Sequence, residues 1–589
     1  MLERTLRCGR RAPKASSRAR WGLPALPPTL RLLTAIVTIH VCGCSSATHP
    51  PPSEDDDTTS LATAAPTTAP GGSSSLATSS PTGAAGAKTP PDQDGFSGLP
   101  NGVAAGMAPP RAPADGTGDV VTGGGNDDGA AGDGGAPESI AMAPMMPSGS
   151  SSPDGEADMV APDPSRGEAP LGDGDLRVFP APGATNVCPD PVIRMRFPSP
   201  PQLGSRGRLQ LFAADSPERA MAILDMADRT PAVDAGGQRI RSRRAIVDGD
   251  QVLFYPPIAD LRPGQTYLVT VDEGVVQQPQ LSITAADNWR FTLSESPASE
   301  HEQRVAHDGS GDYCSILGAL AAVPAAHAPI TLNIGRGKHL GPFVINNGQD
   351  IAFRGDDRKE TVLLGENNEK LNPGTATRAL FSVDRSQRIT LENLTIHNLT
   401  PQGGGQAEAL RLQRCDHCVA RQLDVLSLQD TLLLSGSVYM EDSYVEGNVD
   451  YIWGGGAAYF KNSEFKTVGR GGYLVQSRNP VGETGYVFVD CRLTRSSGVD
   501  KTYLARIEAD RFPGSEVVFI DCAMDSHILR EGFQTTGGLG LQLRFLEYGS
   551  VALDGSPVDM SGRHPSSKRI SAEQAEVYRN PEEVLGFRP

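Results

Sequence analysis

Two aspartates, Asp430 and Asp450, stand 20 residues apart in matching surroundings. Each comes eight residues after the polar position of a short strand-like segment, Gln422 for the first and Asp442 for the second. This spacing predicts equivalent places on neighbouring coils of a solenoid, where adjacent strands lie about 4.8 Å apart. Two carboxyl groups so close cannot easily both ionise, so one pKa should be raised and the other kept low. The pair therefore suits one acid and one base or nucleophile, although two Asx turn residues at strand ends would give the same pattern.

The repeat extends far beyond the two aspartates. Six short segments align on a polar third position, with spacings of 29, 20, 20, 28 and 31 residues: Asn393, Gln422, Asp442, Asn462, Asp490 and Asp521. Short strands repeated at this period, without helical periodicity, indicate a parallel β-helix. Repeating Asn, Asp, Ser and Cys residues, Cys491 and Cys522 among them, would then form internal ladders.

Residues 45–175 differ sharply in composition from the rest of the chain. They carry 19 Asp and Glu against 3 Lys and Arg, a net charge of −16 out of −17 for the whole chain, and Phe96 is their only aromatic residue. A segment this acidic and this poor in apolar residues predicts a disordered linker. The acidity is therefore a property of the linker. Nucleic-acid binding would require a basic face, and this segment has none.

Residues 1–44 have the pattern of an export signal. Several arginines precede an apolar run, Leu32 to Val41, that is too short to span a bilayer. The following "VCGC" resembles the lipobox of a bacterial lipoprotein, with cleavage before Cys44 and lipid on its sulfur. An ordinary secretory peptide is the alternative. We expect an outer-membrane lipoprotein or a cell-surface protein in the first case, a secreted protein in the second, and membrane contact only through the lipid.

Residues 176–298 alternate apolar and polar residues in short runs separated by Pro-Gly turns, which predicts a small β-sandwich. The stretch "PAPGATNV" (180–187) resembles the opening strand of bacterial Ig-like domains. The fold class is therefore all-β, with this sandwich before a β-helix at 303–589. Within the β-helix, "CDHC" (415–418) has no second CxxC partner, so it predicts a disulfide or two free thiols rather than a zinc site.

The segments around the two aspartates resemble the pectin methylesterase (pectinesterase) family. The matching motifs, in the family's order, are "RVAHDGSGDYCSI" (304–316), "QAEALRL" (406–412), "LQDTLL" (428–433), "GNVDYIWG" (447–454), "YLVQSR" (473–478), "ETGYVFVDC" (483–491), "YLAR" (503–506) and "SAEQAEVYRNPEEVLGF" (571–587). The resemblance implies a right-handed parallel β-helix, in agreement with the repeats.

The resemblance also implies roles for individual residues. Asp450 corresponds to the nucleophile, and Asp430 to the general acid that later acts as base. Gln406 and Gln429 correspond to the donors that stabilise the oxyanion. Arg506 corresponds to the arginine that holds the nucleophile, and a cation there should lower the pKa of Asp450 and keep it ionised.

Two aromatic residues are candidates for substrate binding. Tyr451 and Trp453 replace two phenylalanines common in the family, and strand alternation predicts that both point away from Ile452, either to stack on a sugar or to pack the coil. The chain departs from the family after "YLAR" (503–506), where the usual Pro-Trp is absent, and at Phe533, where some relatives have Trp. These departures put the fit of the substrate in doubt.

The activity implied is hydrolysis of methyl-esterified galacturonan, as pectin or short oligogalacturonides, by a monomer without metal or other cofactor. Two alternatives stay open: a pectate lyase, which needs an acidic calcium site and a basic residue, and a non-catalytic glycan-binding β-helix. Because every catalytic motif lies beyond residue 303, we also expect residues 303–589 to fold and act without the sandwich.

Overall fold

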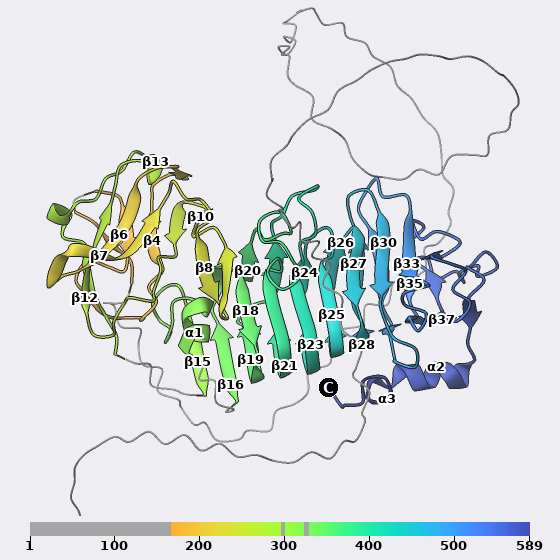
Figure 1. Ribbon diagram of the computed structural model, residues 1–589. Helices are drawn as coiled ribbons and strands as arrows, with labels where there is room; N and C mark the ends of the chain where they lie inside the picture. The colour runs from red at the N-terminus through yellow and green to blue at the C-terminus, as the bar shows by residue number, and fades with distance from the viewer. Residues whose placement is uncertain (1–166, 173, 296–300, 323–328) are drawn as a thin grey trace, which may run out of the picture. The chain divides into compact units, whose positions relative to one another are not determined.

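The β-helix predicted from the repeats is present in the computed structural model, which describes residues 167–589 apart from 173, 296–300 and 323–328. Its strands pair in parallel from coil to coil, as β21 (Phe381–Glu392) does with β23 (Leu410–Arg421). Figure 1 shows these strands side by side, with β25 (Leu432–Glu441) next in line. The signal and lipidation predicted at residues 1–44, including Cys44, lie outside the described residues.

Two parallel sheets form the walls of the β-helix in the described chain. The larger has sixteen strands: β15 (Glu302–Val305), β16 (Ile330–Ile334), β18 (Phe343–Asn346), β19 (Gln349–Gly355), β21, β23, β25, β27 (Val449–Gly454), β28 (Gly456–Lys461), β30 (Gly472–Ser477), β31 (Tyr486–Val489), β33 (Thr502–Glu508), β34 (Glu516–Ile520), β36 (Phe533–Thr536), β37 (Arg544–Tyr548) and β39 (Ser567–Arg569). The smaller has nine: β17 (Gly337–Leu340), β20 (Thr361–Gly365), β22 (Thr395–Asn398), β24 (Asp424–Leu426), β26 (Tyr444–Gly447), β29 (Glu464–Thr467), β32 (Arg492–Arg495), β35 (Ala523–Met524) and β38 (Val551–Ala552). Within the larger sheet, β27, β30, β33 and β36 form a separate line.

The six aligned polar residues are the corners between these two sheets. All have left-handed φ angles between 47° and 56°, a conformation that Asn and Asp tolerate better than most residues. Two neighbouring corners also bond to each other, since the Asn462 amide donates to the Asp442 carboxylate at 2.6 Å. Each aligned segment is therefore a strand end, a corner and the start of the next strand, and not one strand as predicted.

The interior of the β-helix is a ladder of stacked side chains. Phe460, Phe488 and Phe519 stack on successive coils with ring centroids 4.6 and 4.7 Å apart. Cys491 and Cys522 are buried beside them, which confirms the predicted internal ladder. The "CDHC" cysteines are two buried free thiols in β23. Fully burying one such Phe contributes about 1.5–3 kcal/mol, so the ladder stabilises the coils that carry the aspartates.

The helices of the described chain are short: α1 (Ile316–Ala322), α2 (Ala572–Arg579), α3 (Pro581–Leu585) and a 3-10 turn at Ala285–Asp287. α2 begins at Ser571, whose side chain and that of Gln574 form a capping box. α2 and α3 pack against an apolar outer face of the larger sheet that includes Tyr459 and Val487. No helix in the part of the chain that the structure describes is both long and apolar enough to cross a membrane.

Two antiparallel-rich sheets before the β-helix enclose a hydrophobic core, as predicted for a sandwich. One contains β1 (Ala169–Pro170), β2 (Arg177–Phe179), β4 (Ile193–Arg196), β11 (Gln251–Phe254) and β10 (Ala245–Asp248); the other contains β3 (Ala184–Val187), β14 (Arg290–Leu293), β12 (Thr266–Val271), β6 (Arg208–Ala213) and β7 (Ser216–Asp225). Two further pairs are β5 (Gln202–Leu203) with β13 (Val276–Gln278) and β8 (Ala232–Ala235) with β9 (Gln238–Arg241). β1 lies within the segment predicted to be linker, so that boundary was wrong; the Ig-like assignment stays a prediction.

The sandwich and the β-helix are joined by contacts that the sequence did not predict. Cys188 and Cys314 form a disulfide. Buried Asp190 accepts hydrogen bonds from the backbone N–H groups of Cys314 (2.8 Å) and Ser315 (2.7 Å) and from the Ser315 hydroxyl (2.6 Å). Leu340 of the β-helix packs in the sandwich core. The described residues fall within one compact unit, so the sandwich and the β-helix pack against each other.

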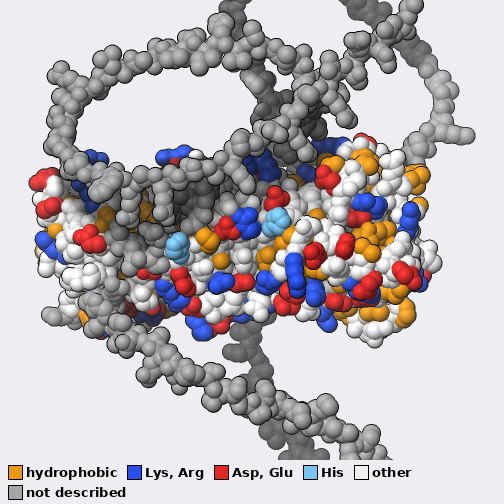
Figure 2. All heavy atoms as spheres, turned by 90° about the horizontal axis from the view of Figure 1, so that it is seen from below, with side chains coloured by type: hydrophobic (Ala, Val, Ile, Leu, Met, Phe, Trp, Pro, Cys, Tyr) orange, Lys and Arg blue, Asp and Glu red, His pale blue; other side chains and the backbone are white. Residues whose placement is uncertain are grey.

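The described surface mixes charges of both signs. Figure 2 shows Lys and Arg side chains interspersed with Asp and Glu on the face it presents, where grey atoms do not cover it. Residues 176–589 carry 42 Lys and Arg against 50 Asp and Glu, a modest net charge of −8.

Candidate active site

The two aspartates lie on adjacent coils, as predicted. Leu432 of β25 pairs with Ile452 of β27, and each aspartate lies two residues before its paired residue. The Asp430 N–H donates to the Val449 carbonyl at 3.1 Å. Both aspartates have left-handed φ angles, 65° for Asp430 and 47° for Asp450, and both side chains are largely buried.

A third carboxyl group, Glu408, occupies the same place one coil earlier. Leu410 of β23 pairs with Leu432, so Glu408 stands to Leu410 as Asp430 stands to Leu432. Glu408 is 0% exposed. Sequence analysis missed Glu408, although it precedes Leu410 by two residues, just as Asp430 precedes Leu432. Asp430 is therefore the middle member of a stack of three carboxyl groups.

Arginines contact each member of this stack. The Arg506 Nη2 donates to Asp450 Oδ2, which confirms the pairing predicted between them. Arg378, which sequence analysis also missed, donates from Nη2 to Asp430 Oδ2 at 3.2 Å and from Nε and Nη2 to the Glu408 carboxylate at 2.9 and 2.7 Å. Arg378 precedes β21 and lies 52 residues before Asp430, so no local pattern links the two.

The two aspartates differ in proton affinity. Burial and the charge of Glu408 raise the pKa of Asp430 to about 8, against the opposing effects of Arg378 and Arg478. Burial raises the pKa of Asp450 to about 6, and Arg506 is the strongest influence lowering it. As predicted, the pKa of Asp430, the proposed acid, is higher than that of Asp450. The expectation that Asp450 has a low pKa was wrong, because burial outweighs the nearby cation.

Buried polar atoms without a hydrogen-bond partner gather around Asp450. Arg478 lies over the Trp453 ring at 4.5 Å, and Arg506 pairs in register with Gln534. The unpartnered atoms are Asp450 Oδ1, Trp453 Nε1, Arg478 Nε, Arg506 Nε and Gln534 Oε1. Most buried polar groups in native proteins are paired, so such a cluster indicates a place where a polar ligand completes the bonding.

Gln406 and Gln429 lie next to the carboxyl stack through their backbones. The Gln429 carbonyl accepts from the Ala407 N–H at 3.1 Å, and the Gln406 carbonyl accepts from the Glu369 N–H at 3.0 Å. Both glutamine side chains are half-buried. Neither side-chain amide bonds to any described residue, which leaves both free to donate to a ligand.

Tyr451 packs the coil, one of the two roles left open by the sequence, and its assignment as a candidate substrate contact is wrong. Its side chain is 1% exposed in the β-helix core, and its hydroxyl lies 3.2 Å from the Thr467 hydroxyl. The left-handed residue Asp450 and the register shift between Val449 and Ile452 break the strand alternation on which the prediction relied. Tyr451 is therefore removed from the candidate substrate contacts.

Trp453 does lie beside the site. It is 7% exposed, and the Arg378 guanidinium lies 5.8 Å from its ring while that of Arg478 lies at 4.5 Å. These cation–π contacts hold the indole in place as a wall of the site. Direct stacking of a sugar on Trp453 stays a prediction.

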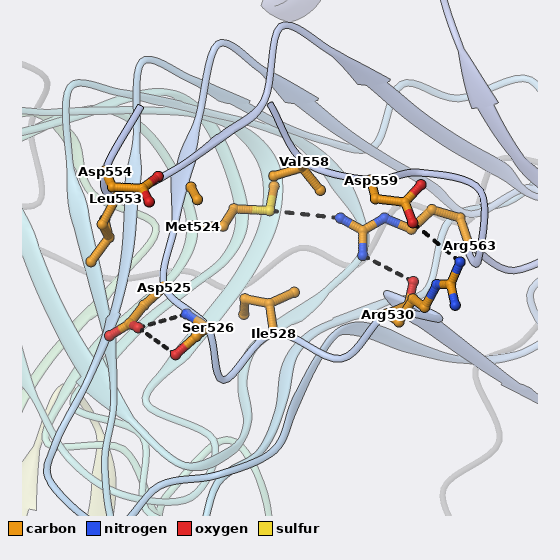
Figure 3. Close-up of a pocket in the computed structure, with 11 residues that line it drawn as sticks. Met524, Asp525, Ser526, Ile528, Arg530, Leu553, Asp554, Val558, Asp559 and Arg563 are labelled. Atoms are coloured by element: carbon orange, nitrogen blue, oxygen red, sulfur yellow. Dashed lines mark hydrogen bonds and ion pairs between the residues drawn. The ribbon is translucent and has the colours of Figure 1, made fainter. Parts of the chain in front are cut away.

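A cavity of about 410 Å³ lies elsewhere, between the last coils (Figure 3). Its charged side chains already have partners: Arg530 donates to Asp559 at 3.1 Å, and Arg563 donates to Glu547 Oε1 at 2.9 Å and to the Leu529 carbonyl at 3.0 Å. None of the unpartnered buried atoms of the described chain belongs to its lining. The chemistry therefore points to the carboxyl stack and not to this cavity.

Comparison with known proteins agrees with this geometry. The sequence profile of the family described as Pectinesterase matches residues 302–584. Pectinesterase 31 of Arabidopsis thaliana is 32% identical over 247 residues, which span 40% of this chain and 77% of that protein. The chain belongs to the pectinesterase family. Pectinesterase 2 of Olea europaea is 30% identical over 291 residues, 46% of this chain and 75% of that protein.

The pectinesterase match covers the β-helix and leaves out the sandwich. Among solved structures, the pectin methylesterase from carrot is 23% identical with a TM-score of 0.44, covering 50% of this chain and 95% of that one. The pectin methylesterase PemA from Erwinia chrysanthemi is 20% identical with a TM-score of 0.42, covering 50% of this chain and 98% of that one. All five residues proposed for catalysis lie inside the pectinesterase match.

Proposed function

We propose that the protein hydrolyses methyl esters of galacturonan to give free carboxylates and methanol. The observation that carries the proposal is the pairing of Arg506 with Asp450 on the coil next to Asp430. This arrangement places an ionisable nucleophile beside a carboxyl group with a much higher proton affinity. Membership of the pectinesterase family supports the same reaction.

In the first step, Asp450 Oδ1, which has no partner in the described chain, attacks the carbonyl carbon of the ester. Gln406 and Gln429 donate to the oxygen on which negative charge develops. The bond to the methoxy oxygen then breaks, Asp430 gives its proton to that oxygen, and methanol leaves. The substrate acyl group remains on Asp450 as a mixed anhydride.

In the second step, Asp430 is a carboxylate and acts as base. It takes a proton from a water molecule, whose oxygen attacks the acyl carbon while the bond to Asp450 breaks. Asp450 is released as a carboxylate, paired again with Arg506. Asp430 is protonated for the next cycle, and the product acid loses its proton to solvent.

The alternatives are separated by one assay. The enzyme should release methanol from methyl-esterified pectin and from short methylated oligogalacturonides, and EDTA should not change the rate. A pectate lyase would instead form unsaturated products and lose activity with EDTA. A glycan-binding protein would give neither product, and that result would refute the proposal.

The activity should depend on pH through both aspartates. Asp450 must be ionised to attack, so kcat/KM should fall as pH drops through about 6. Asp430 must carry a proton in the free enzyme, so kcat/KM should also fall as pH rises through about 8. A bell-shaped profile of methanol release with its plateau between these values is expected. A profile that keeps rising well above pH 9 would contradict the role of Asp430.

Replacing either glutamine should slow turnover without unfolding the protein. Gln406→Ala or Gln429→Ala should reduce kcat by roughly 10²–10³, as expected for loss of one oxyanion donor. The melting temperature should change little, because neither side-chain amide bonds to a described residue. Turnover close to the unmodified level in either variant would remove that residue from the site.

A further inference from the structure

Arg378 is held at three points beside the carboxyl stack. Its Nε and Nη2 bond to Glu408, its Nη1 donates to Glu369 Oε2 at 2.9 Å, and its Nη2 also reaches Asp430 Oδ2 at 3.2 Å. The Arg378 side chain is only 8% exposed. A guanidinium held in this way has one orientation, so the direction of its bond to Asp430 is set by its other two partners.

The buried Arg378–Glu408 pair needs an explanation beyond stability. Removing both charges from water costs several kcal/mol per ion, and an apolar pair of similar volume often serves stability as well. Glu408 stands directly before Asp430 in the carboxyl stack. A buried negative charge at that place raises the pKa of Asp430.

We propose that Arg378 and Glu408 are a positioning pair for Asp430, in which Glu408 orients Arg378 and Arg378 holds Asp430 Oδ2. Asp430 Oδ1, which bonds to no described residue, is thereby left to exchange the proton with methanol and water. Glu408 and Asp450 favour the protonated form of Asp430 before the first step. Arg378 and Arg478 stabilise the carboxylate left after proton transfer. The inference rests on the proposed ester hydrolysis.

Glu408→Gln tests the electrostatic part of the proposal in the full chain. Gln keeps the shape and one acceptor oxygen but removes the charge, so Asp430 should lose its proton more easily. The alkaline limb of kcat/KM should move to lower pH by about one unit. An unchanged limb with unchanged kcat in a folded Glu408→Gln protein would overturn the proposal.

Arg378→Lys tests the positioning part and remains informative if Glu408→Gln does not fold. Lys keeps the positive charge but cannot bond Glu408, Glu369 and Asp430 together as a planar fork. We expect kcat to fall about 10-fold or more, with KM within about 3-fold and the alkaline limb nearly in place. A kcat equal to that of the unmodified enzyme would show that the fork does not position Asp430.

Asp424→Asn is the matched control. Asp424 in β24 is a buried carboxylate, and Arg358 donates to it from Nε at 2.7 Å, away from the carboxyl stack. Its loss should lower the melting temperature without moving either limb of the pH profile. An equal shift in this variant would mean that the effect of Glu408→Gln is general destabilisation. If the unmodified protein releases no methanol, the proposed function fails. If it releases methanol and Glu408→Gln changes neither the alkaline limb nor kcat, only this inference fails.

Discussion

Asp450→Asn is expected to reduce methanol release by about 10⁴-fold or more, the size of effect seen when a covalent nucleophile is removed. The amide that replaces the carboxylate is a poor nucleophile, and it no longer forms an ion pair with Arg506. The variant should fold, because Asn tolerates the left-handed φ of 47° at this position. Methanol release and intact-protein mass spectrometry measure the two consequences, turnover and acyl-enzyme formation.

Asp430→Asn is the control that separates the two carboxyl groups. An ester with a more acidic leaving alcohol needs less proton donation, so its first step should be partly restored in Asp430→Asn and not in Asp450→Asn. Hydrolysis of the acyl-enzyme stays slow without the base, so a covalent adduct on Asp450 should accumulate. An adduct mapped to Asp430 in the Asp450→Asn protein would reverse the two roles.

A fragment of residues 302–589 is expected not to fold, in contrast to the expectation drawn from the motifs alone. Removing the sandwich deletes the partner of Cys314, leaves the α1 end of the β-helix without Asp190, and exposes Leu340 and Leu364. It also removes the Arg241 backbone, which exchanges two 2.8 Å hydrogen bonds with the Asn372 side chain. Circular dichroism and methanol release of the fragment test this.

The full chain with Cys188→Ser and Cys314→Ser is the matched control for the fragment. It keeps every other junction contact and loses only a crosslink spanning 126 residues. The free energy of unfolding should fall by about 2–5 kcal/mol while turnover is retained. A soluble, cooperatively unfolding and fully active 302–589 fragment would show instead that the sandwich is dispensable.

The loop that carries Glu369 links the junction to the site. Asn372, which bonds Arg241 of β9, also donates to Asn367 at 2.7 Å. The same loop presents Glu369 to Arg378. The junction with the sandwich is therefore connected through this loop to Arg378, which holds Asp430.

The stacking of Asp430 on Asp450 could be predicted from the sequence because it is a periodic property. Two residues at the same offset in consecutive repeats occupy the same place on consecutive coils, whatever the rest of the fold does. Glu408 lies 15 residues after Asn393 and not eight, so this offset would not have found it. The pairing of Arg506 with Asp450 was predicted from the motifs of the pectinesterase family. The repeat period alone could not have predicted this contact.

Other features depended on the tertiary structure. Tyr451 turned inward because the left-handed φ of Asp450 interrupts the alternation of its strand, and alternation holds only while the backbone stays extended. Arg378 reaches Asp430 across 52 residues, and Cys188 reaches Cys314 across 126. Contacts of this kind arise where separate loops and domains meet in space. Local sequence patterns therefore do not predict them.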